Sequence, residues 1–277
     1  MEKVELLVEL KKNKTALVGL VLISVLVVVA AIGPYLAPHH PLKPDPMNRL
    51  MGPSRDHPFG TDSLGRDILS RVIFGSRISI LIGLIAVSIS LVPGTLLGLV
   101  SGYYGRRVDE PLMRFMDILL AFPAILLAIF ITAILGPSLL NTMIAVGIVY
   151  IPHYARIVRS TVLSLKEQLF VQAVRSLGGS NLRILARHIL PNTVPPIIVY
   201  ATLGMGTAVL QAAALGFLGL GAQPPIPEWG AMLSEGRQYI QNAPHVAAFP
   251  GLAIFLLVLG FNLFGDGLRD ILDPSLR

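Results

Sequence analysis

Long apolar stretches without charge dominate this sequence and restrict what it can fold into. Residues 15–42, 78–105 and 118–155 contain no Asp, Glu, Lys or Arg. About 20 apolar residues in a helix cross the hydrocarbon of a bilayer, and each stretch exceeds that length. Only 14% of the 277 residues are charged and the mean hydropathy is +0.71, too apolar for a soluble domain. The chain is therefore predicted to be an all-α, polytopic membrane protein.

Six transmembrane helices are predicted from these stretches. The uncharged run at 118–155 is nearly twice as long as one span requires, and Gly-Pro-Ser at 136–138 is expected to divide it into two spans joined by a tight turn. Small residues four apart in GTLLG and GLVSG would let another helix approach the second span closely. The other four spans are expected at about 15–36, 78–105, 193–213 and 247–265.

The charged segments between these spans are predicted to lie in water. Closely spaced prolines and mixed charges after residue 37 indicate an exposed loop, in which only about 65–76 has the spacing of a short amphipathic helix. The segment RRVDEPLMR at 106–114 is likewise expected to leave the membrane, as are the loop after the fifth span and the tail GDGLRDILDPSLR.

The distribution of basic residues predicts the orientation. With the amino terminus inside, fifteen Lys and Arg fall on the cytoplasmic side and seven on the other. The positive-inside rule then places both termini in the cytoplasm. The net charge of +6 has the same origin, so nucleic acid is not an expected partner.

Candidate chemistry is sparse, and no catalytic, cofactor or metal site is predicted. The chain has no cysteine, no HExxH pair and no GxSxG elbow, and its loop histidines are expected to be solvated. It has no GxxxxGK[ST] loop for a nucleotide. Ionisable groups such as Asp117 and Asp266 occur only near span ends, unlike those of ion-coupled transporters. The energy for transport is therefore expected to come from another subunit.

One polar stretch, VQAVRSLGGSNLRILARHILPN at 171–192, interrupts the apolar pattern. Apolar spacing predicts two short amphipathic helices, separated by Gly178 and Gly179, with Ser180 capping the second and Pro191 ending it or beginning the next span. Such a hairpin could lie on lipid headgroups through its arginines, or it could fit a groove on a cytosolic partner. The residues alone leave both interpretations open.

This stretch resembles the EAA loop of ABC-importer permeases, in which Glu-Ala-Ala is followed by a glycine and then by a leucine-proline pair. The spacing is kept, but Gln172 replaces the glutamate, Val174 the second alanine and His188 an isoleucine. The resemblance implies a coupling loop at about 155–191 that contacts an ATPase. Its residues in this sequence are Gln172, Ala173, Val174, Arg175, Leu177, Gly178, Leu190 and Pro191.

Three further segments are similar to the C-type permease subunits of dipeptide, oligopeptide and nickel importers. They are HPFGTDSLGRDILSRVIFGSRISI, GYYGRRVDEPLMRFMDILLAFP and LGFLGLGAQPPIPEWGAML, and they occur in the family's order. The resemblance implies a type I importer core at 57–277, preceded at 1–56 by the amino-terminal segment, the first span and part of the external loop.

The implied partners are a homologous B-type permease, two cytosolic ATPases that bind ATP and magnesium, and an extracytoplasmic binding protein that delivers the substrate. The resemblance also implies the inner (plasma) membrane of a prokaryote. A stand-alone channel or ion-coupled transporter is the alternative, and a membrane enzyme is a third hypothesis. The substrate, whether a peptide, a nickel chelate or a sugar, is left open.

Overall fold

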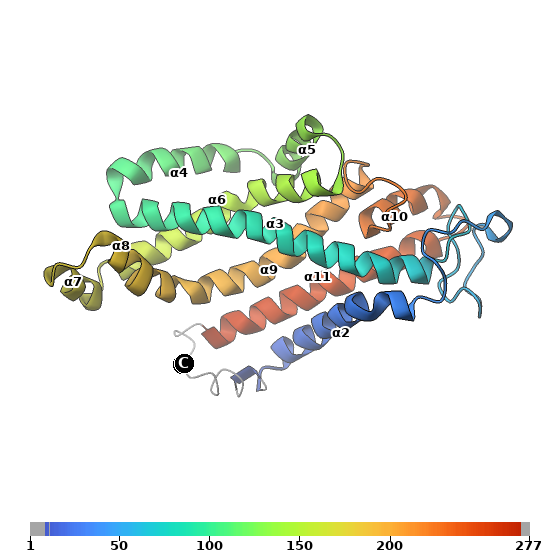
Figure 1. Cartoon of the computed structure of the whole chain (residues 1–277), viewed down its shortest axis with the longest axis horizontal. Coiled ribbons are helices and arrows are strands. Elements are labelled where there is room, and N and C mark those ends of the chain that lie inside the picture. Colours follow the sequence, from blue (N-terminus) through green and yellow to red (C-terminus); the bar gives the residue numbers. More distant parts are fainter. Residues whose placement is uncertain (1–8, 11, 273–277) are drawn as a thin grey trace.

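The computed structural model describes residues 9–10 and 12–272, and the regular elements within them are helices. The molecule is elongated, with its long helices running along its length (Figure 1). A hairpin formed by α7 (Leu169–Ser176) and α8 (Asn181–Ile184) lies at one end, and the loop at 37–67 lies at the other. The predicted all-α fold is confirmed.

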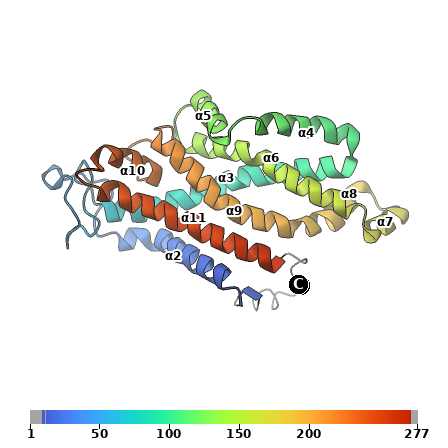
Figure 2. The same ribbon diagram turned by 180° about the vertical axis from the view of Figure 1, so that it is seen from behind.

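The first helix, α2 (Lys14–Leu36), agrees with the predicted first span at 15–36. The Asn13 side chain caps it by accepting the backbone N–H of Ala16 at 3.0 Å. α2 packs along α11 (His245–Leu272), which in turn packs along α9 (Leu190–Phe217), so that α11 lies between the other two (Figure 2).

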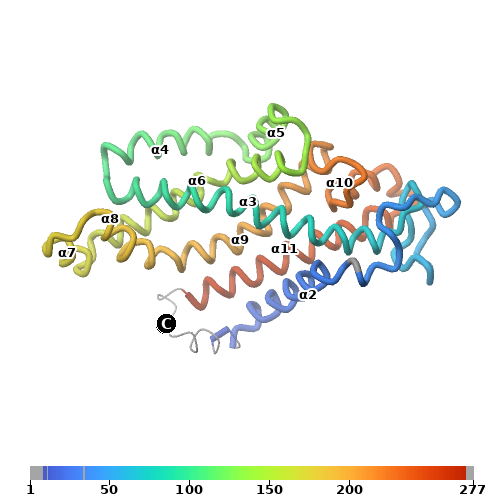
Figure 3. The backbone as a smooth tube through the Cα atoms, viewed as in Figure 1, coloured from blue at the N-terminus to red at the C-terminus, as the bar shows by residue number. Residues whose placement is uncertain are grey.

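The second long helix, α3 (Ile68–Tyr104), corrects one prediction. A short helix at 65–76 separate from a span at 78–105 was expected, but one helix of 37 residues covers both (Figure 3). Arg77 lies within α3, between the two predicted elements. Its guanidinium group donates to the backbone oxygens of Ala30 and Ala31 in α2, the latter at 2.6 Å. Because these backbone oxygens accept its hydrogen bonds, the charge of Arg77 is accommodated against α2, and α3 continues past it.

The segment at 106–114, predicted to leave the membrane, forms the start of a helix that was not predicted, α4 (Arg106–Leu120). α4 meets α5 (Ala124–Leu135) at an angle of 91°. Pro123 follows the break, and a proline disfavours helical geometry in the residue before it. With 12 residues, α5 is about 18 Å long, shorter than the hydrocarbon layer. The third predicted span is therefore a broken one.

The predicted turn at 136–138 is confirmed, because α5 ends just before it and α6 (Leu139–Leu165) begins just after it. Within the described residues, four helices are long and apolar enough to cross a membrane, or five if the bent pair counts as one span. The four are α2, α3, the run from α8 to α9, and α11. The prediction of six spans further requires α6, which runs beside α3 and carries Arg156 and Arg159 in its second half.

Closely spaced glycines explain the extensive packing of α3 on α6. Gly94, Gly98 and Gly102 lie four residues apart, and a Cβ on any of them would fall within 2.8 Å of an atom of α6. These are the glycines of GTLLG and GLVSG, so the predicted small-residue face is the one on which α6 packs.

The chain between α9 and α11 agrees in part with the prediction. Residues 218–228 form an irregular loop as expected, but an unpredicted helix, α10 (Trp229–Gly236), follows. Trp229 is buried and its indole N–H donates to the backbone oxygen of Val72 at 3.0 Å, which fixes α10 against α3. The last span, predicted at 247–265, extends through part of the expected tail to Leu272.

The loop at 37–67, predicted to be exposed, is partly buried by ion pairs. Arg66 donates to Asp62 at 2.6 Å and to Glu235 of α10 at 2.8 Å, and Arg71 contacts the same two carboxylates at 3.5 and 3.4 Å. Asp62, Arg66 and Arg71 are each at most 3% exposed. Buried charges are tolerated when they are paired, so this network holds the loop on the helix bundle.

Candidate functional site

The polar stretch forms the predicted hairpin. α7 ends at Ser176, Gly178 adopts a positive φ of 79°, and the Ser180 hydroxyl caps α8 by accepting the backbone N–H of Arg183 at 3.4 Å. Pro191 lies in the first turn of α9, so it begins the next span and does not end the second hairpin helix. A π-helical turn at 185–189, which the sequence did not indicate, joins α8 to α9.

The glycine pair closes α7 with the hydrogen bonds of a Schellman motif. The N–H of Gly178 donates to Arg175 O and that of Gly179 to Val174 O, both at 3.0 Å. A Cβ on Gly178 would meet nothing within 4 Å, whereas one on Gly179 would lie 2.7 Å from the Val174 side chain. Gly178 is thus required by its backbone conformation and Gly179 by its close contact.

The hairpin residues have two distinct environments. Val171, Ile184 and Ile189 are fully buried and pack with Val158 and other residues of α3, α6 and α9. A second group, four large apolar side chains that are exposed, forms what we call the apolar tip. The apolar tip consists of Leu169 (82% exposed), Phe170 (41%), Leu177 (88%) and Leu182 (76%).

The remaining predicted coupling residues lie around the apolar tip. Gln172, Ala173 and Arg175 are exposed, while Val174 and Leu190 are half-buried against the inner cluster. The Gln172 amide donates to Glu167 O at 3.1 Å, which closes the turn that leads into α7. In this structure Gln172 therefore stabilises the base of the hairpin through its own chain.

Tyr103, near the end of α3, contacts both helices of the hairpin. Its hydroxyl donates to Asn181 Oδ1 at 2.8 Å, and the Arg175 guanidinium lies 5.7 Å from the centre of its ring. Hydrogen bonding and cation–π attraction thus join α8 and α7 to the same side chain. This role of Tyr103 was not predicted, because nothing in its local sequence distinguishes it from other tyrosines at span ends.

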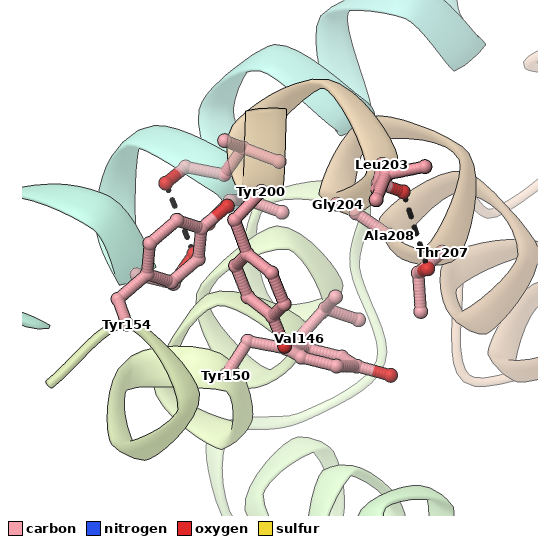
Figure 4. Close-up of a pocket in the computed structure, with 11 residues that line it drawn as sticks. Val146, Tyr150, Tyr154, Tyr200, Leu203, Gly204, Thr207 and Ala208 are labelled. Atoms are coloured by element: carbon pink, nitrogen blue, oxygen red, sulfur yellow. Dashed lines mark hydrogen bonds between the residues drawn. The ribbon is translucent and has the colours of Figure 1, made fainter. Parts of the chain in front are cut away.

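A cavity of about 70 Å³ lies among α3, α6 and α9 (Figure 4). Its polar groups come mainly from Tyr150 and Tyr154 of α6 and Tyr200 of α9, with Tyr154 and Tyr200 edge-on at 5.0 Å between ring centres. Ser90 and Thr207 also line it, but their hydroxyls donate to backbone oxygens of their own helices. This cavity was not predicted, because no regular spacing in the sequence indicates that the three tyrosines lie close together.

Tyr154 differs from the other cavity residues because its hydroxyl is buried without a hydrogen-bond partner among the described residues. The residue is 2% exposed, and a Cβ on Gly204 would lie 2.7 Å from the hydroxyl oxygen. A buried polar group without a partner costs about 1–3 kcal/mol. The hydroxyl therefore has hydrogen-bonding capacity that the described chain does not use.

A wider groove of about 510 Å³ continues from the cavity, sharing Tyr200 and Leu203 with it. Its walls are otherwise apolar, apart from Arg269 of α11 near its far limit. Together the cavity and the groove extend from the middle of the bundle to Leu272, where α11 ends. Membrane-length helices packed around an internal cavity lined by tyrosines, with a hairpin that presents an apolar tip at one end, are the arrangement of a transport permease.

Comparison with known families agrees with this class. A family model described as binding-protein-dependent transport system inner membrane component matches residues 94–277, and the N-terminal TM domain of oligopeptide transport permease C matches residues 5–53. The chain belongs to this family of inner membrane components, which are permeases of ABC importers. The resemblance to C-type permeases is thereby confirmed.

Named relatives cover nearly the whole chain. The dipeptide transport system permease protein DppC of Alkalihalophilus pseudofirmus is 56% identical over 97% of this chain and 88% of its own length. The glutathione transport system permease protein GsiD of Escherichia coli is 51% identical, and the di/tripeptide transport system permease protein DppC of Pseudomonas aeruginosa is 49% identical. Each covers 96% of this chain, with 88% and 89% of the relatives' lengths matched.

The fold is also shared with a solved transporter. An inward-facing structure of the MetNI methionine ABC transporter contains a chain that matches 74% of this one and 97% of its own length, with a TM-score of 0.60 and 20% identity. The predicted type I importer core is confirmed by this likeness of fold.

Proposed function

We propose that this chain imports short peptides, forming the translocation path together with a second, homologous permease. The relatives described above are named for dipeptides, di/tripeptides and glutathione, which share amide and carboxylate groups. Peptide import is therefore the transport activity that they favour for this chain. Nickel chelates and sugars, which the sequence left open, are the alternatives that a transport assay distinguishes.

The observation that carries this proposal is the apolar tip, where four large apolar side chains are exposed on the hairpin at one end of the molecule. Burying such side chains against a partner is favourable by about 25 cal/mol per Å² of apolar surface. The proposed partner is a cleft on one of two cytosolic ATPases, which are proposed to bind ATP and magnesium. Ala173, Arg175 and Gly178 surround the tip, and Gln172 acts on the hairpin's own shape instead of pairing with the ATPase.

The proposed path uses the tyrosine cavity and the groove beyond it. Tyrosine hydroxyls can exchange hydrogen bonds with peptide amides, and Arg269 can attract a carboxylate at the end of the groove. If the hairpin faces an ATPase, both termini are cytoplasmic, since α2 begins and α11 ends toward the hairpin's side of the bundle (Figure 1). The loop at 37–67 then faces the substrate-binding protein, and residues 57–277 act as the permease core behind the segment at 1–56.

Reconstitution tests the proposal. The chain is co-expressed with its second permease and two ATPases, placed in liposomes, and given the binding protein with a radiolabelled dipeptide. We expect ATP-dependent uptake and none from the chain alone. The double variant Leu177→Ser with Leu182→Ser should lose the ATPases on purification, while Ala186→Ser, at an exposed position of the same hairpin, should keep them.

Other outcomes would support the competing functions. Uptake by the isolated chain under an ion gradient, without ATP, would identify a stand-alone transporter, and substrate turnover without partners would identify an enzyme. Replacing Arg175, Arg183 and Arg187 together by Gln tests whether the hairpin lies on lipid headgroups. That interpretation requires altered membrane insertion with coupling preserved.

A further inference from the structure

Three side chains far apart in sequence meet at the end of the bundle opposite the hairpin. His39 follows α2, His57 lies in the loop, and Asp67 caps α3. The Nδ1 atoms of His57 and His39 lie 3.0 and 3.8 Å from Asp67 Oδ1, and the three potential ligand atoms are all within 4.8 Å of one another. The expectation that the loop histidines are solvated is wrong for His57, whose side chain is 12% exposed.

The two carboxylate oxygens of Asp67 have separate partners. Oδ2 accepts the backbone N–H of Ser70 at 2.7 Å and its hydroxyl at 2.6 Å, which anchors the fully buried carboxylate at the start of α3. Oδ1 faces the two imidazoles. The backbone N–H of His39 also donates to the Ser70 hydroxyl, at 3.1 Å, so His39 is held over the same helix start.

A single hydrogen bond from His57 to Asp67 would explain only part of this arrangement. The His39 ring lies beside that of His57, with 4.5 Å between ring centres and a tilt of 30°, and its Nδ1 faces the same carboxylate oxygen. Two imidazole nitrogens and one carboxylate oxygen around one point are a ligand set that transition metals prefer, whereas magnesium and calcium prefer oxygen alone.

We propose that His39, His57 and Asp67 bind a divalent transition-metal ion of the zinc type. Two ligand atoms bound tetrahedrally to zinc at about 2.0–2.1 Å lie about 3.3 Å apart, and the observed 3.0 and 3.8 Å bracket that value. His39 is 41% exposed at its side chain, which leaves a fourth position open to water. The ion would link His39, just after α2, to Asp67, the N-cap residue of α3.

Zinc titration of the purified full chain tests this site. The protein is isolated without a polyhistidine tag and titrated by calorimetry with zinc, then with cobalt, whose visible absorption reports the coordination geometry. We expect one ion per chain and a four-coordinate spectrum. His39→Ala should weaken binding at least about tenfold, as losses around metal sites commonly do.

His40→Ala is the matched control, because His40 is adjacent and its Nδ1 instead accepts the backbone N–H of Leu42 at 3.2 Å. It should bind zinc as the native chain does. His39→Ala removes a largely exposed ring and keeps the His57–Asp67 hydrogen bond, so its thermal midpoint without metal should be native.

Zinc should raise the thermal midpoint of the native chain and of His40→Ala, but not of His39→Ala. Binding that is unchanged in His39→Ala, or lost equally in His40→Ala, would overturn the proposal, as would the absence of any binding to the native chain. None of these results depends on transport, so the site can fail while the proposed function stands, and the reverse.

Discussion

The hydroxyl of Tyr103 donates a hydrogen bond to Asn181 Oδ1 at 2.8 Å, which ties the end of α3 to the second helix of the hairpin. The same ring lies under Arg175 of the first helix, at 5.7 Å. Because α3 also supplies Ser90 to the tyrosine cavity, one helix contacts both the hairpin and the cavity. A displacement of the hairpin by a partner can thus reach the cavity through α3.

Tyr103→Phe tests this connection. The change keeps the ring beneath Arg175 but removes the hydrogen bond to Asn181, which is worth about 0.5–1.5 kcal/mol. We expect ATP-driven uptake to fall about two- to tenfold and hydrogen exchange across 169–189 to increase, with membrane insertion unchanged. Tyr104→Phe is the control, since Tyr104 is 51% exposed and its ring contacts the ring of Tyr103 edge-on. Equal loss in both variants would contradict the assignment.

A substitution at Gly178 separates backbone strain from steric clash. Its φ of 79° disfavours a branched side chain by about 1–2 kcal/mol, while nothing lies within 4 Å of the added Cβ. Gly178→Leu should therefore insert normally and lose ATP-coupled uptake. Gly178→Asn should retain uptake, because asparagine tolerates this conformation. Uptake assays on both variants in the reconstituted complex measure the difference, and native uptake in Gly178→Leu would show that the turn is not a coupling element.

The hairpin was predictable because its determinants are local. Glycines at 178 and 179, a capping serine and apolar spacing each act within a few residues, and the structure reproduces all three. The burial of the long loop and the full length of α3 were not predictable, because both depend on residues distant in the sequence. Arg77 is accommodated by carbonyls of α2, and Arg66 and Arg71 both contact Glu235 of α10, which is more than 160 residues away in the sequence.

The tyrosine cavity and the histidine cluster were also not predictable, because their residues meet only in the folded structure. Tyr150, Tyr154 and Tyr200 meet through the packing of α6 on α9, and no period in the sequence encodes that crossing. The bend between α4 and α5 was likewise missed, although Pro123 marks its position. Charges in 106–114 indicated a segment in water but not its helical structure, in which Asp109 binds Arg159 of α6.

Tyr154→Phe distinguishes a structural hydroxyl from one that contacts substrate. Removing a buried hydroxyl without a partner should stabilise the chain by about 1–3 kcal/mol, seen as a higher thermal midpoint. Uptake should nevertheless fall, because the proposed path loses a hydrogen-bonding group. Ser90→Ala is the comparison, since its hydroxyl is bound to its own helix, and it should leave uptake unchanged. A stabilised Tyr154→Phe variant with native uptake would remove this hydroxyl from the path.

Glu228 gives the protein a defined dependence on pH. Burial raises the pKa of this carboxyl above its usual value of about 4.3, against the lowering effect of the Gly230 and Ala231 N–H groups. The folded state then binds the proton more tightly than the unfolded state, so stability contributed by protonated Glu228 is lost as pH rises from about 4.3 through the folded pKa. The thermal midpoint of the native chain should fall relative to Glu228→Gln over that range. A constant difference in thermal midpoint between the native chain and Glu228→Gln across this range would contradict the prediction.

Filling the groove should block the proposed path without disturbing the fold. Val199 lines the groove between α9 and α11, and tryptophan at this position would occupy much of its width. Ile198, the preceding residue, is 46% exposed and does not line the groove, so Ile198→Trp is the matched control. We expect Val199→Trp to assemble with its partners and to retain their ATP hydrolysis while uptake of labelled dipeptide falls to a small fraction of the native rate. Ile198→Trp should transport normally, and native uptake in Val199→Trp would mean that the substrate passes elsewhere.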